Sequence, residues 1–439
     1  MFQSNRLALL PILCFLVLFV GAGLYFTIQN IDHPFYQISP TVAILPALVL
    51  AILVGKGTII EKLDVFMEGV GHRNITTMCM IYLLAGAFTN SAEAIGGVQS
   101  TVNLALEFIP DGYILPGIFL ITSFISLSIG TSMGTIAAIS PIAIGLAGAA
   151  DLPLSLTMGA VIGGAMFGDN LSMISDATIA AVQSQGCTMV GRFKFNVRLA
   201  IPAMVFTTLI LATTSIPHET IHPQGPYHLL HVVPYLAILG LAIFGYNVMV
   251  ALMLGIMAVG IIGLATVSDY TVLIFAKSIY AGYASMQEIL ILSLLIGGLS
   301  HLTKQQGGIA YLIHLIEKIS ARFSRKQHSQ RAGEFAISTI VSLADICTAN
   351  NTVSIILTGE AAREIAKRNH VDPARSASML DIFSCVFQGI LPYSAQVLLA
   401  ASIAKISPFS VIPYIHYSYI LGGIAVLSII FSYPRSLRG

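Results

Sequence analysis

The chain has 439 residues, of which 56% are apolar and only 9% are charged, with a formal net charge of +1. Soluble globular proteins are about 45–50% apolar and about 25% charged. So few charges cannot cover the surface of a water-soluble protein, which excludes a soluble enzyme, a secreted domain and a disordered chain. The near-neutral charge leaves no basic excess to hold nucleic acid. The composition predicts a polytopic membrane protein that lies in a lipid bilayer.

The first apolar run, residues 7–26, follows Arg6 and is itself followed by a second run at 41–54. A cleaved signal peptide has a shorter apolar core, so we interpret the first run as a retained helix. Several later runs are shorter than the roughly 20 residues that a full crossing needs. Those at 113–150 and 334–361 are interrupted by short polar stretches. We predict that these two regions form re-entrant hairpins or discontinuous helices.

The two halves of the chain resemble each other. Three segments of the first half align with three of the second half in the same order, at a shift that grows from 211 through 217 to 220 residues. They pair 83–98 with 294–309, 131–135 with 348–352, and 153–181 with 373–401. Matches in order at a nearly constant shift indicate an internal duplication.

The charges of the loops predict how the two copies are oriented. The loop after the opening helix of the first copy carries Glu107 and Asp111, whereas its counterpart carries five basic residues (Lys318, Arg322, Arg325, Lys326 and Arg331). Basic loops stay in the cytoplasm. We therefore expect the loops 317–331 and 360–375 to be cytoplasmic and the two repeats to be inverted.

Inverted repeats with interrupted helices are typical of secondary transporters, whose binding site lies at the repeat interface near the membrane midplane. The alternative is an old duplication that is retained only for packing. We predict an all-α polytopic membrane protein with two inverted-topology repeats, each with a re-entrant hairpin and a discontinuous helix. The expected parts are N-terminal membrane helices, repeat 1, connecting membrane helices, repeat 2, and a C-terminal membrane helix with its tail, at 1–74, 75–190, 191–287, 288–406 and 407–439.

The most polar intramembrane segment follows the glycines at 163–168. It places two carboxylates, an amide and hydroxyls within an apolar helix, at Asp169, Asn170, Ser172, Ser175 and Asp176. A charge at the bilayer centre costs about 3 kcal/mol or more, so such residues usually have a function. We expect Gly168 to let the backbone unwind beside Asp169 and free carbonyl oxygens for a cation. The segment is predicted to bind an ion or to titrate; the alternative is that its acids only cap a half-helix.

The hairpin tips are small and polar between apolar arms. Helix N-termini that face a central site supply free N–H groups and a positive dipole. The first tip is expected to contribute Thr131, Ser132 and Thr135 to the ion site, and the second tip Thr348, Asn350, Asn351 and Thr352 to a substrate site. In the alternative interpretation these side chains only cap their helices.

The second discontinuous helix is predicted at Gly389 and Pro392 and carries no acid at the positions of Asp169 and Asp176. Its polar residues Tyr393, Ser394 and Gln396 are candidate substrate ligands. Two further acids lie in apolar surroundings. Asp345 is a candidate proton carrier together with Asp169, and Asp381 is a candidate to face a cationic substrate, unless a buried partner neutralises either acid.

Residues 167–176 resemble the motif Gly-Asp-x-x-Ser-Pro-x-Ser-Asp-Thr-Thr of the NhaC-type sodium/proton antiporters, and Leu391-Pro392-Tyr393 resembles that family's Leu-Pro-Trp element. The resemblance implies the ion transporter superfamily, with elevator-like motion of a transport domain and homodimers. It also implies that Asp169, Ser172, Ser175 and Asp176 are cation or proton ligands, with Na⁺ held by Asp169 and Asp176. Met173, Ala177 and Tyr393 depart from the motifs and indicate a divergent branch. Related branches are thought to import amino acids such as histidine and lysine.

Two hypotheses on function are left open. The first is Na⁺/H⁺ exchange at a shared carboxylate, in the inner membrane of a bacterium. The second is a Na⁺- or H⁺-coupled amino-acid symporter on the same fold. Neither is an enzyme, and neither needs a cofactor beyond the coupling ion. An intramembrane aspartyl protease is disfavoured because Met166 stands where such enzymes need glycine. Broken helices in inverted repeats favour alternating access over a channel.

Overall fold

The computed structural model describes residues 4–29, 31, 37–55, 57–108, 113–173, 175–214, 228–244, 246–323 and 329–433. These residues form helices and no strand. Six helices are long and apolar enough to cross a membrane, or up to eight spans if each of two bent helix pairs counts as one. The prediction of an all-α polytopic membrane protein is confirmed. Asp111, Arg325 and Lys326 lie outside the described residues.

The first half of the chain holds an N-terminal group of helices and then the first repeat. The N-terminal group is η1 (Arg6–Leu9), α1 (Leu10–Ile28), α2 (Pro40–Leu53) and α3 (Ile59–Val70). The first repeat consists of α4 (Arg73–Ala94), α5 (Gly97–Phe108), α6 (Ile114–Ile129), α7 (Ser132–Ala149), α8 (Leu154–Leu171) and α9 (Asp176–Gln185). It is followed directly by α10 (Met189–Thr214).

Three helices connect the repeats, namely α11 (Leu229–Ile243), α12 (Val248–Thr266) and α13 (Val272–Ser285). The second repeat has the same order of elements as the first: α14 (Gln287–Gln305), α15 (Gly308–Phe323), α16 (Gln330–Thr348), α17 (Asn351–Arg368), α18 (Pro373–Ile390) and α19 (Ala395–Ala404). The described chain ends with α20 (Pro408–Val411), η3 (Ile412–Tyr414) and α21 (His416–Phe431).

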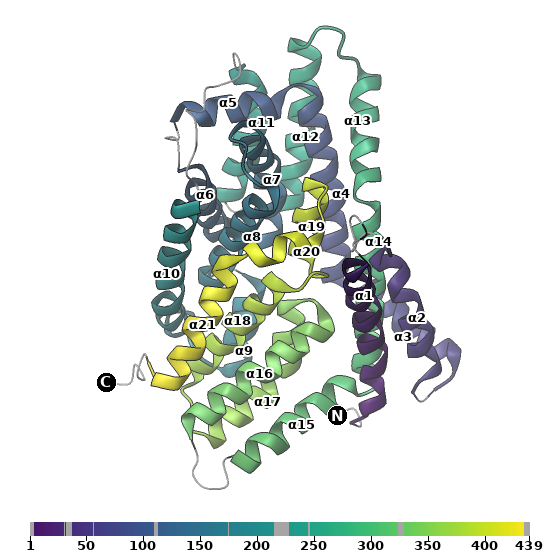
Figure 1. Ribbon diagram of the computed structural model, residues 1–439, viewed down its shortest axis with the longest axis vertical. Coiled ribbons are helices and arrows are strands. Elements are labelled where there is room, and N and C mark those ends of the chain that lie inside the picture. Colours follow the sequence, from purple (N-terminus) through teal and green to yellow (C-terminus); the bar gives the residue numbers. More distant parts are fainter. Residues whose placement is uncertain are drawn as a thin grey trace.

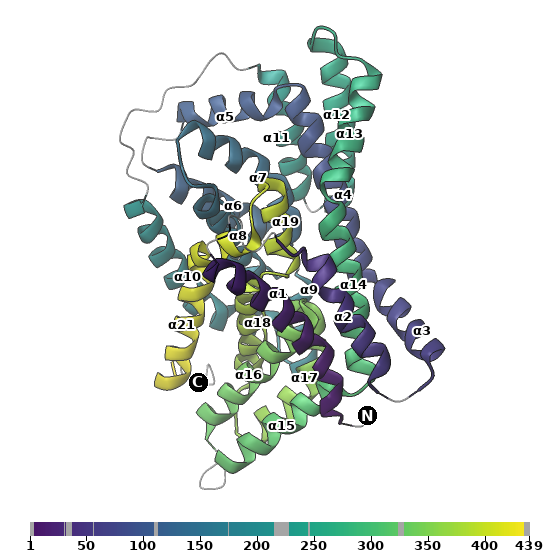
Figure 2. The same cartoon turned by 45° about the vertical axis from the view of Figure 1, so that its right-hand side comes forward.

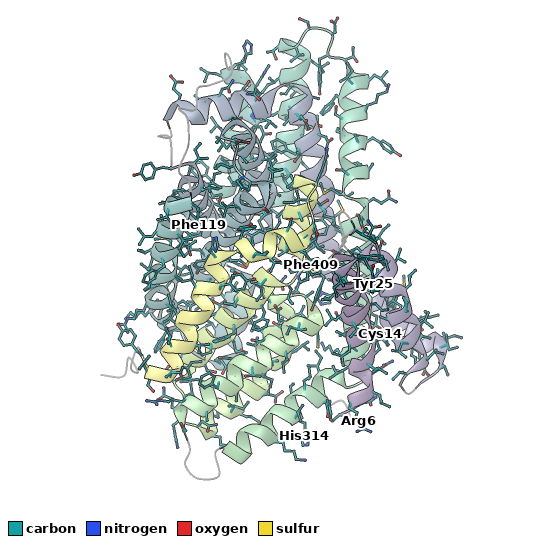
Figure 3. The ribbon with its side chains drawn as sticks, in the orientation of Figure 1. Arg6, Cys14, Tyr25, Phe119, His314 and Phe409 are labelled. Atoms are coloured by element: carbon teal, nitrogen blue, oxygen red, sulfur yellow. The ribbon has the colours of Figure 1, made fainter. Side chains whose placement is uncertain are left out.

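The two repeats are inverted. Figure 1 places α5 and the hairpin α6–α7 in the upper part of the molecule, and α15 and the hairpin α16–α17 in the lower part. Equivalent elements therefore reach opposite faces, as the loop charges predict. Helix α1 lies across the face of the second repeat (Figure 2). There Phe15 packs edge-on against Tyr393, and Phe19 packs against Phe409, which is labelled in Figure 3.

Backbone geometry corrects the register of the repeat. Left-handed residues end corresponding helices at Gly130 and Ala349, and again at Gly186 and Lys405, a shift of 219 residues in both cases. The same shift relates the helix starts at Ser132 and Asn351. The shifts of 217 and 220 that the sequence suggested were therefore wrong, because short matches of small polar residues slip easily. In the corrected register, Ser132 corresponds to Asn351 and Asp169 to Gln388.

Both helix breaks form near their predicted positions, but not at the glycines. Helix α8 continues through Gly168 to Leu171, and α18 continues through Gly389 to Ile390. Gly168 instead allows close packing, because a Cβ atom there would lie 2.3 Å from the Cβ atom of Ser126 on α6. Gly389 likewise packs closely on α21, because a Cβ atom added at Gly389 would lie 2.4 Å from Ser418 Oγ. The expectation that Gly168 unwinds the backbone beside Asp169 was wrong.

The predicted basic loop 360–375 is mostly helical. Helix α17 extends to Arg368, and α18 begins at Pro373. Arg375 is buried in α18 and forms an ion pair with Glu334 of α16, with 2.6 Å between Nε and Oε1. This pair joins the outer ends of the hairpin and of the broken helix in the second repeat.

Candidate ion site at the crossing of the two repeats

Asp169 is the centre of a polar cluster that both repeats build. It lies in the last turn of α8 and is only 5% exposed. Its carboxylate accepts hydrogen bonds from Ser175 Oγ (2.6 Å), Ser132 Oγ (3.2 Å) and Asn351 Nδ2 (3.4 Å). Ser132 begins α7 and Asn351 begins α17, so the tips of the two opposed hairpins meet at one carboxylate.

The cluster continues into the second broken helix. Gln396 Nε2 donates to Ser132 Oγ (3.1 Å), and Gln388 Nε2 donates to Gln396 Oε1 (2.7 Å) and to the carbonyl oxygen of Ala349 (3.0 Å). Among the described residues, no basic side chain forms an ion pair with Asp169. The site thus holds one carboxylate among hydroxyl and amide groups. Such a donor set suits a proton or a small hard cation.

Sequence reasoning missed Arg192, which lies on α10 and is fully buried. Its guanidinium pairs with Asp381 of α18. It also donates to the carbonyl oxygens of Asn170 (2.6 Å) and Ser172 (3.2 Å). The carbonyls that the break of α8 frees are therefore bound by a cation of the protein itself, which corrects the expectation that they are open to a transported ion.

Asn196, one turn beyond Arg192, was also missed. Its Nδ2 donates to Asp381 Oδ2 (2.7 Å) and to Asn170 Oδ1 (2.9 Å). The spacing of four residues at the start of a 26-residue apolar helix was the available signal, because it places both side chains on one face. Three buried atoms of this second cluster have no hydrogen-bond partner, namely Arg192 Nε, Asn170 Nδ2 and Asp381 Oδ1.

Asp176 is not part of the Asp169 cluster. It is exposed and lies in the first turn of α9, where a carboxylate interacts favourably with the helix dipole. The four-residue break between α8 and α9 separates the two acids, so this structure does not bring Asp169 and Asp176 together as ligands of one sodium ion.

Several predicted residues of the hairpin tips and of the second broken helix hydrogen-bond to backbone atoms. Asn350 caps α17 through Val353 N (3.0 Å), and Ser394 caps α19 through Val397 N (3.4 Å). Three hydroxyls donate to carbonyl oxygens: Thr135 to Thr131 (2.9 Å), Thr348 to Ala344 (2.9 Å) and Tyr393 to Ile346 (2.7 Å). Thr352 donates its backbone N–H to Asn351 Oδ1 (2.8 Å). Capping and support thus account for the hydrogen bonds of these residues.

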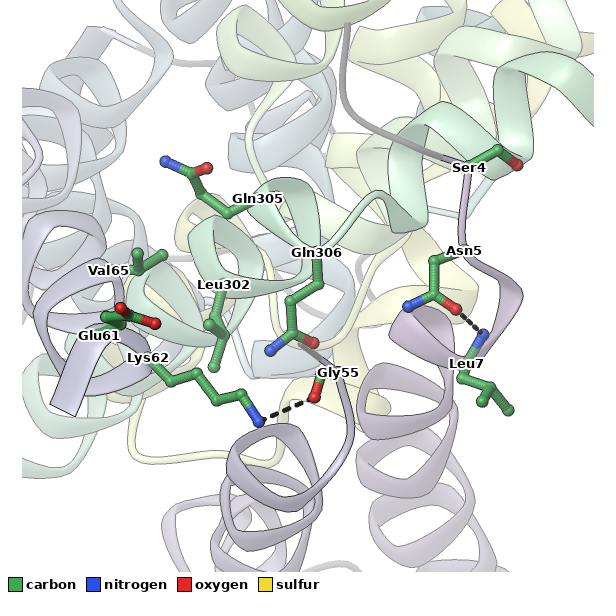
Figure 4. Close-up of a pocket in the computed structure, with 10 residues that line it drawn as sticks. All are labelled: Ser4, Asn5, Leu7, Gly55, Glu61, Lys62, Val65, Leu302, Gln305 and Gln306. Atoms are coloured by element: carbon green, nitrogen blue, oxygen red, sulfur yellow. Dashed lines mark hydrogen bonds between the residues drawn. The ribbon is translucent and has the colours of Figure 1, made fainter. Parts of the chain in front are cut away.

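A cavity of about 650 Å³ lies apart from this cluster, beside η1, α3 and the end of α14 (Figure 4). Lys62 is buried at its wall and donates to the carbonyl oxygens of Ile52 (2.7 Å) and Gly55 (3.1 Å). None of the predicted site residues lines this cavity. It therefore takes no part in the candidate ion site.

Comparison with known proteins shows similarity to one family of transporters. Residues 61–216, which include the motif around Asp169, match the family described as the Na⁺/H⁺ antiporter family. This match and two relatives of 25% and 23% identity support the NhaC-type Na⁺/H⁺ antiporter family for this chain. This confirms the resemblance that the motif at 167–176 indicates, and the family is one of transporters rather than enzymes.

Three characterised relatives match along most of the chain. The malate-2H⁺/Na⁺-lactate antiporter of Bacillus subtilis is 25% identical over 81% of this chain and 81% of its own length. The Na⁺/H⁺ antiporter NhaC of the same organism is 23% identical over 81% and 83%. The arginine/ornithine antiporter ArcD of Halobacterium salinarum is 20% identical over 79% and 76%. Among solved structures, the YdaH transporter of Alcanivorax borkumensis matches with a TM-score of 0.42 and 16% identity, over 98% of this chain and 99% of that one.

Proposed function

We propose that this member of the antiporter family exchanges Na⁺ for H⁺ and that Asp169 is the carboxylate for which the two ions compete. The observation that carries the proposal is that opposed hairpins and a helix break place three neutral donors around one buried acid. Ser132, Ser175 and Asn351 can turn a hydroxyl or amide oxygen toward a cation when one replaces the proton.

Competition for one carboxylate is sufficient for coupling. The carboxylate cannot cross the low-dielectric interior with its charge uncompensated, so it moves with either a proton or a cation bound. Because Asp169 contacts both repeats, a movement of one part against the other would change the side from which the site is reached. We place the protein in a bacterial inner membrane as a homodimer with elevator-like motion, with the loops 317–331 and 360–375 in the cytoplasm.

The test of this proposal is Asp169→Asn in proteoliposomes that contain a pH-sensitive dye. The proton flux that a sodium gradient drives should fall to the level of empty vesicles, because the amide of asparagine does not bind or release a proton near neutral pH. Asp151→Asn is the matched control. It makes the same change at an exposed acid in a left-handed turn conformation, which asparagine also adopts. Wild-type flux in Asp169→Asn would disprove the assignment.

A second candidate function is coupled transport of an amino acid, such as histidine or lysine, with Na⁺ or H⁺. It is favoured by the three unpartnered atoms beside the ion site. Arg192 Nε and Asn170 Nδ2 are donors that suit a carboxylate, and Asp381 Oδ1 is an acceptor that suits an ammonium group. Two relatives are named as antiporters of organic ions.

The two functions are separated by uptake of labelled histidine, lysine and malate under imposed sodium or pH gradients. Accumulation of a solute that stops when the gradient is dissipated would make organic transport the main function. Proton–sodium exchange without accumulation of any of the three would leave the first proposal standing and reject these solutes as substrates.

A further inference from the structure

Asp345 is a second buried acid, and its surroundings differ from those of Asp169. It lies on α16, three residues before the end of that helix at the second hairpin tip. The residue is fully buried. Neither oxygen of its carboxyl group accepts a hydrogen bond. Asp169, by contrast, accepts three.

No group around Asp345 can balance a negative charge. Its titratable neighbours within the described residues are Cys347 on the same helix and Tyr393 from the break between α18 and α19, and both are neutral weak acids. The hydroxyl of Ser354 on α17 lies nearby but donates to the carbonyl oxygen of Asn351 (2.8 Å).

The helices α14, α15, α17, α18 and α21 also pack on α16. In the parts of them that the structure describes, no basic side chain pairs with Asp345. An ionised carboxylate without partners in such an interior would cost several kcal/mol or more, so the group instead keeps its proton. In this conformation Asp345 is therefore a neutral acid.

Two hydrogen bonds from other elements hold the turn of α16 beside Asp345. Tyr393 donates to the carbonyl oxygen of Ile346 (2.7 Å), and Ser300 of α14 donates to that of Cys347 (2.8 Å). Both bonds hold the turn of α16 that carries Asp345. A movement of the hairpin that breaks them would admit water to the acid, and the acid could then release its proton.

We propose that Asp345 is a proton-only site, separate from the ion site, which carries one further proton per transport cycle. The proposal rests on the proposed exchange at Asp169. Water on one side of the membrane supplies the proton that forms the O–H bond of Asp345, and water on the other side receives that proton when the bond breaks. Sodium does not bind there because the one hydroxyl beside the carboxyl group on α17, that of Ser354, donates to the carbonyl oxygen of Asn351, and the described residues offer no cage of several oxygen ligands.

The proton count of the cycle tests this. In vesicles held at zero membrane potential, the sodium gradient that just stops net flux is measured against the imposed pH gradient. The slope of the logarithmic sodium ratio against the pH difference equals the number of protons exchanged per sodium ion. We expect Asp345→Asn, which has the shape of the protonated acid, to lower this slope by one. Asp151→Asn should keep the wild-type slope, and an unchanged slope in Asp345→Asn would overturn the proposal.

If Asp345→Asn carries no flux, infrared difference spectra between sodium-loaded and sodium-free protein show whether Asp345 changes its protonation. A change in the carbonyl band of a protonated acid in the wild type that is absent from Asp345→Asn supports the proposal; the same change in both overturns it. The two proposals fail separately. If the slope is unchanged in Asp345→Asn while Asp169→Asn still abolishes exchange, only the proposal of a second proton at Asp345 is refuted. If exchange persists in Asp169→Asn, the assignment of the ion site is refuted.

Discussion

Three buried acids of the protein have three different surroundings. Asp381 is paired with Arg192, Asp169 accepts hydrogen bonds from neutral side chains, and Asp345 has no partner. The charge of Asp381 is thus already balanced within the protein. A change of protonation at the other two acids would not break a buried ion pair.

At this scale we predict that Arg192→Gln destabilises the protein by about 3–5 kcal/mol, since it leaves the carboxylate of Asp381 buried without its cation. The measurement is thermal unfolding in detergent. The double variant Arg192→Gln with Asp381→Asn should recover most of the loss, because a neutral amide then faces a neutral amide. If the double variant were as unstable as the sum of the two single variants, the pair would not be coupled.

Single helices are shaped here by close approach as much as by hydrophobicity. Helices α6 and α8 pack tightly because Gly168 has no side chain, and a Cβ atom there would also lie 2.4 Å from the backbone nitrogen of Leu127. This contact aligns the end of α8, and with it Asp169, against the first hairpin. The helix then ends three residues later, at Leu171.

Gly168→Ala should therefore lower stability by about 1–3 kcal/mol, the usual cost of an overpacked interior. It should also weaken exchange, because Asp169 is the next residue. Gly148→Ala on α7 is the matched control. A Cβ atom at Gly148 meets nothing within 4 Å, so we expect unchanged or slightly higher stability from the better helix propensity of alanine. Equal melting temperatures for both variants would contradict the role given to Gly168.

In the whole molecule, each broken helix connects the two repeats. Helix α9 packs on α17 of the other hairpin, and α19 packs on α7. Two chain breaks therefore lie where the repeats meet. A site formed in this way contains groups from both repeats.

The inverted arrangement predicts opposite accessibility for equivalent loops. Asp151 and His370 occupy the same left-handed position after α7 and α17, at the shift of 219 residues. In a background without the five native cysteines, a membrane-impermeant maleimide should label Asp151→Cys from the outside of intact cells. It should label His370→Cys only after the cells are opened. Labelling of both from the same side would contradict the inversion.

The sequence by itself determined the membrane location, the duplication, the two hairpins and the regions of the two breaks. These follow from local hydropathy, loop charge and interrupted apolar runs, which need no knowledge of distant contacts. It also identified Asp169, because an acid within an apolar helix is costly wherever the helix lies. Only the tertiary structure decided which of the buried acids is paired with a basic side chain. Arg192 and Asp381 are 189 residues apart, and the choice of a partner for a buried charge depends on distances in space that no local pattern contains. The same holds for Asp176, which is exposed whereas Asp169 is buried, and for the register of the repeat, which left-handed residues fixed.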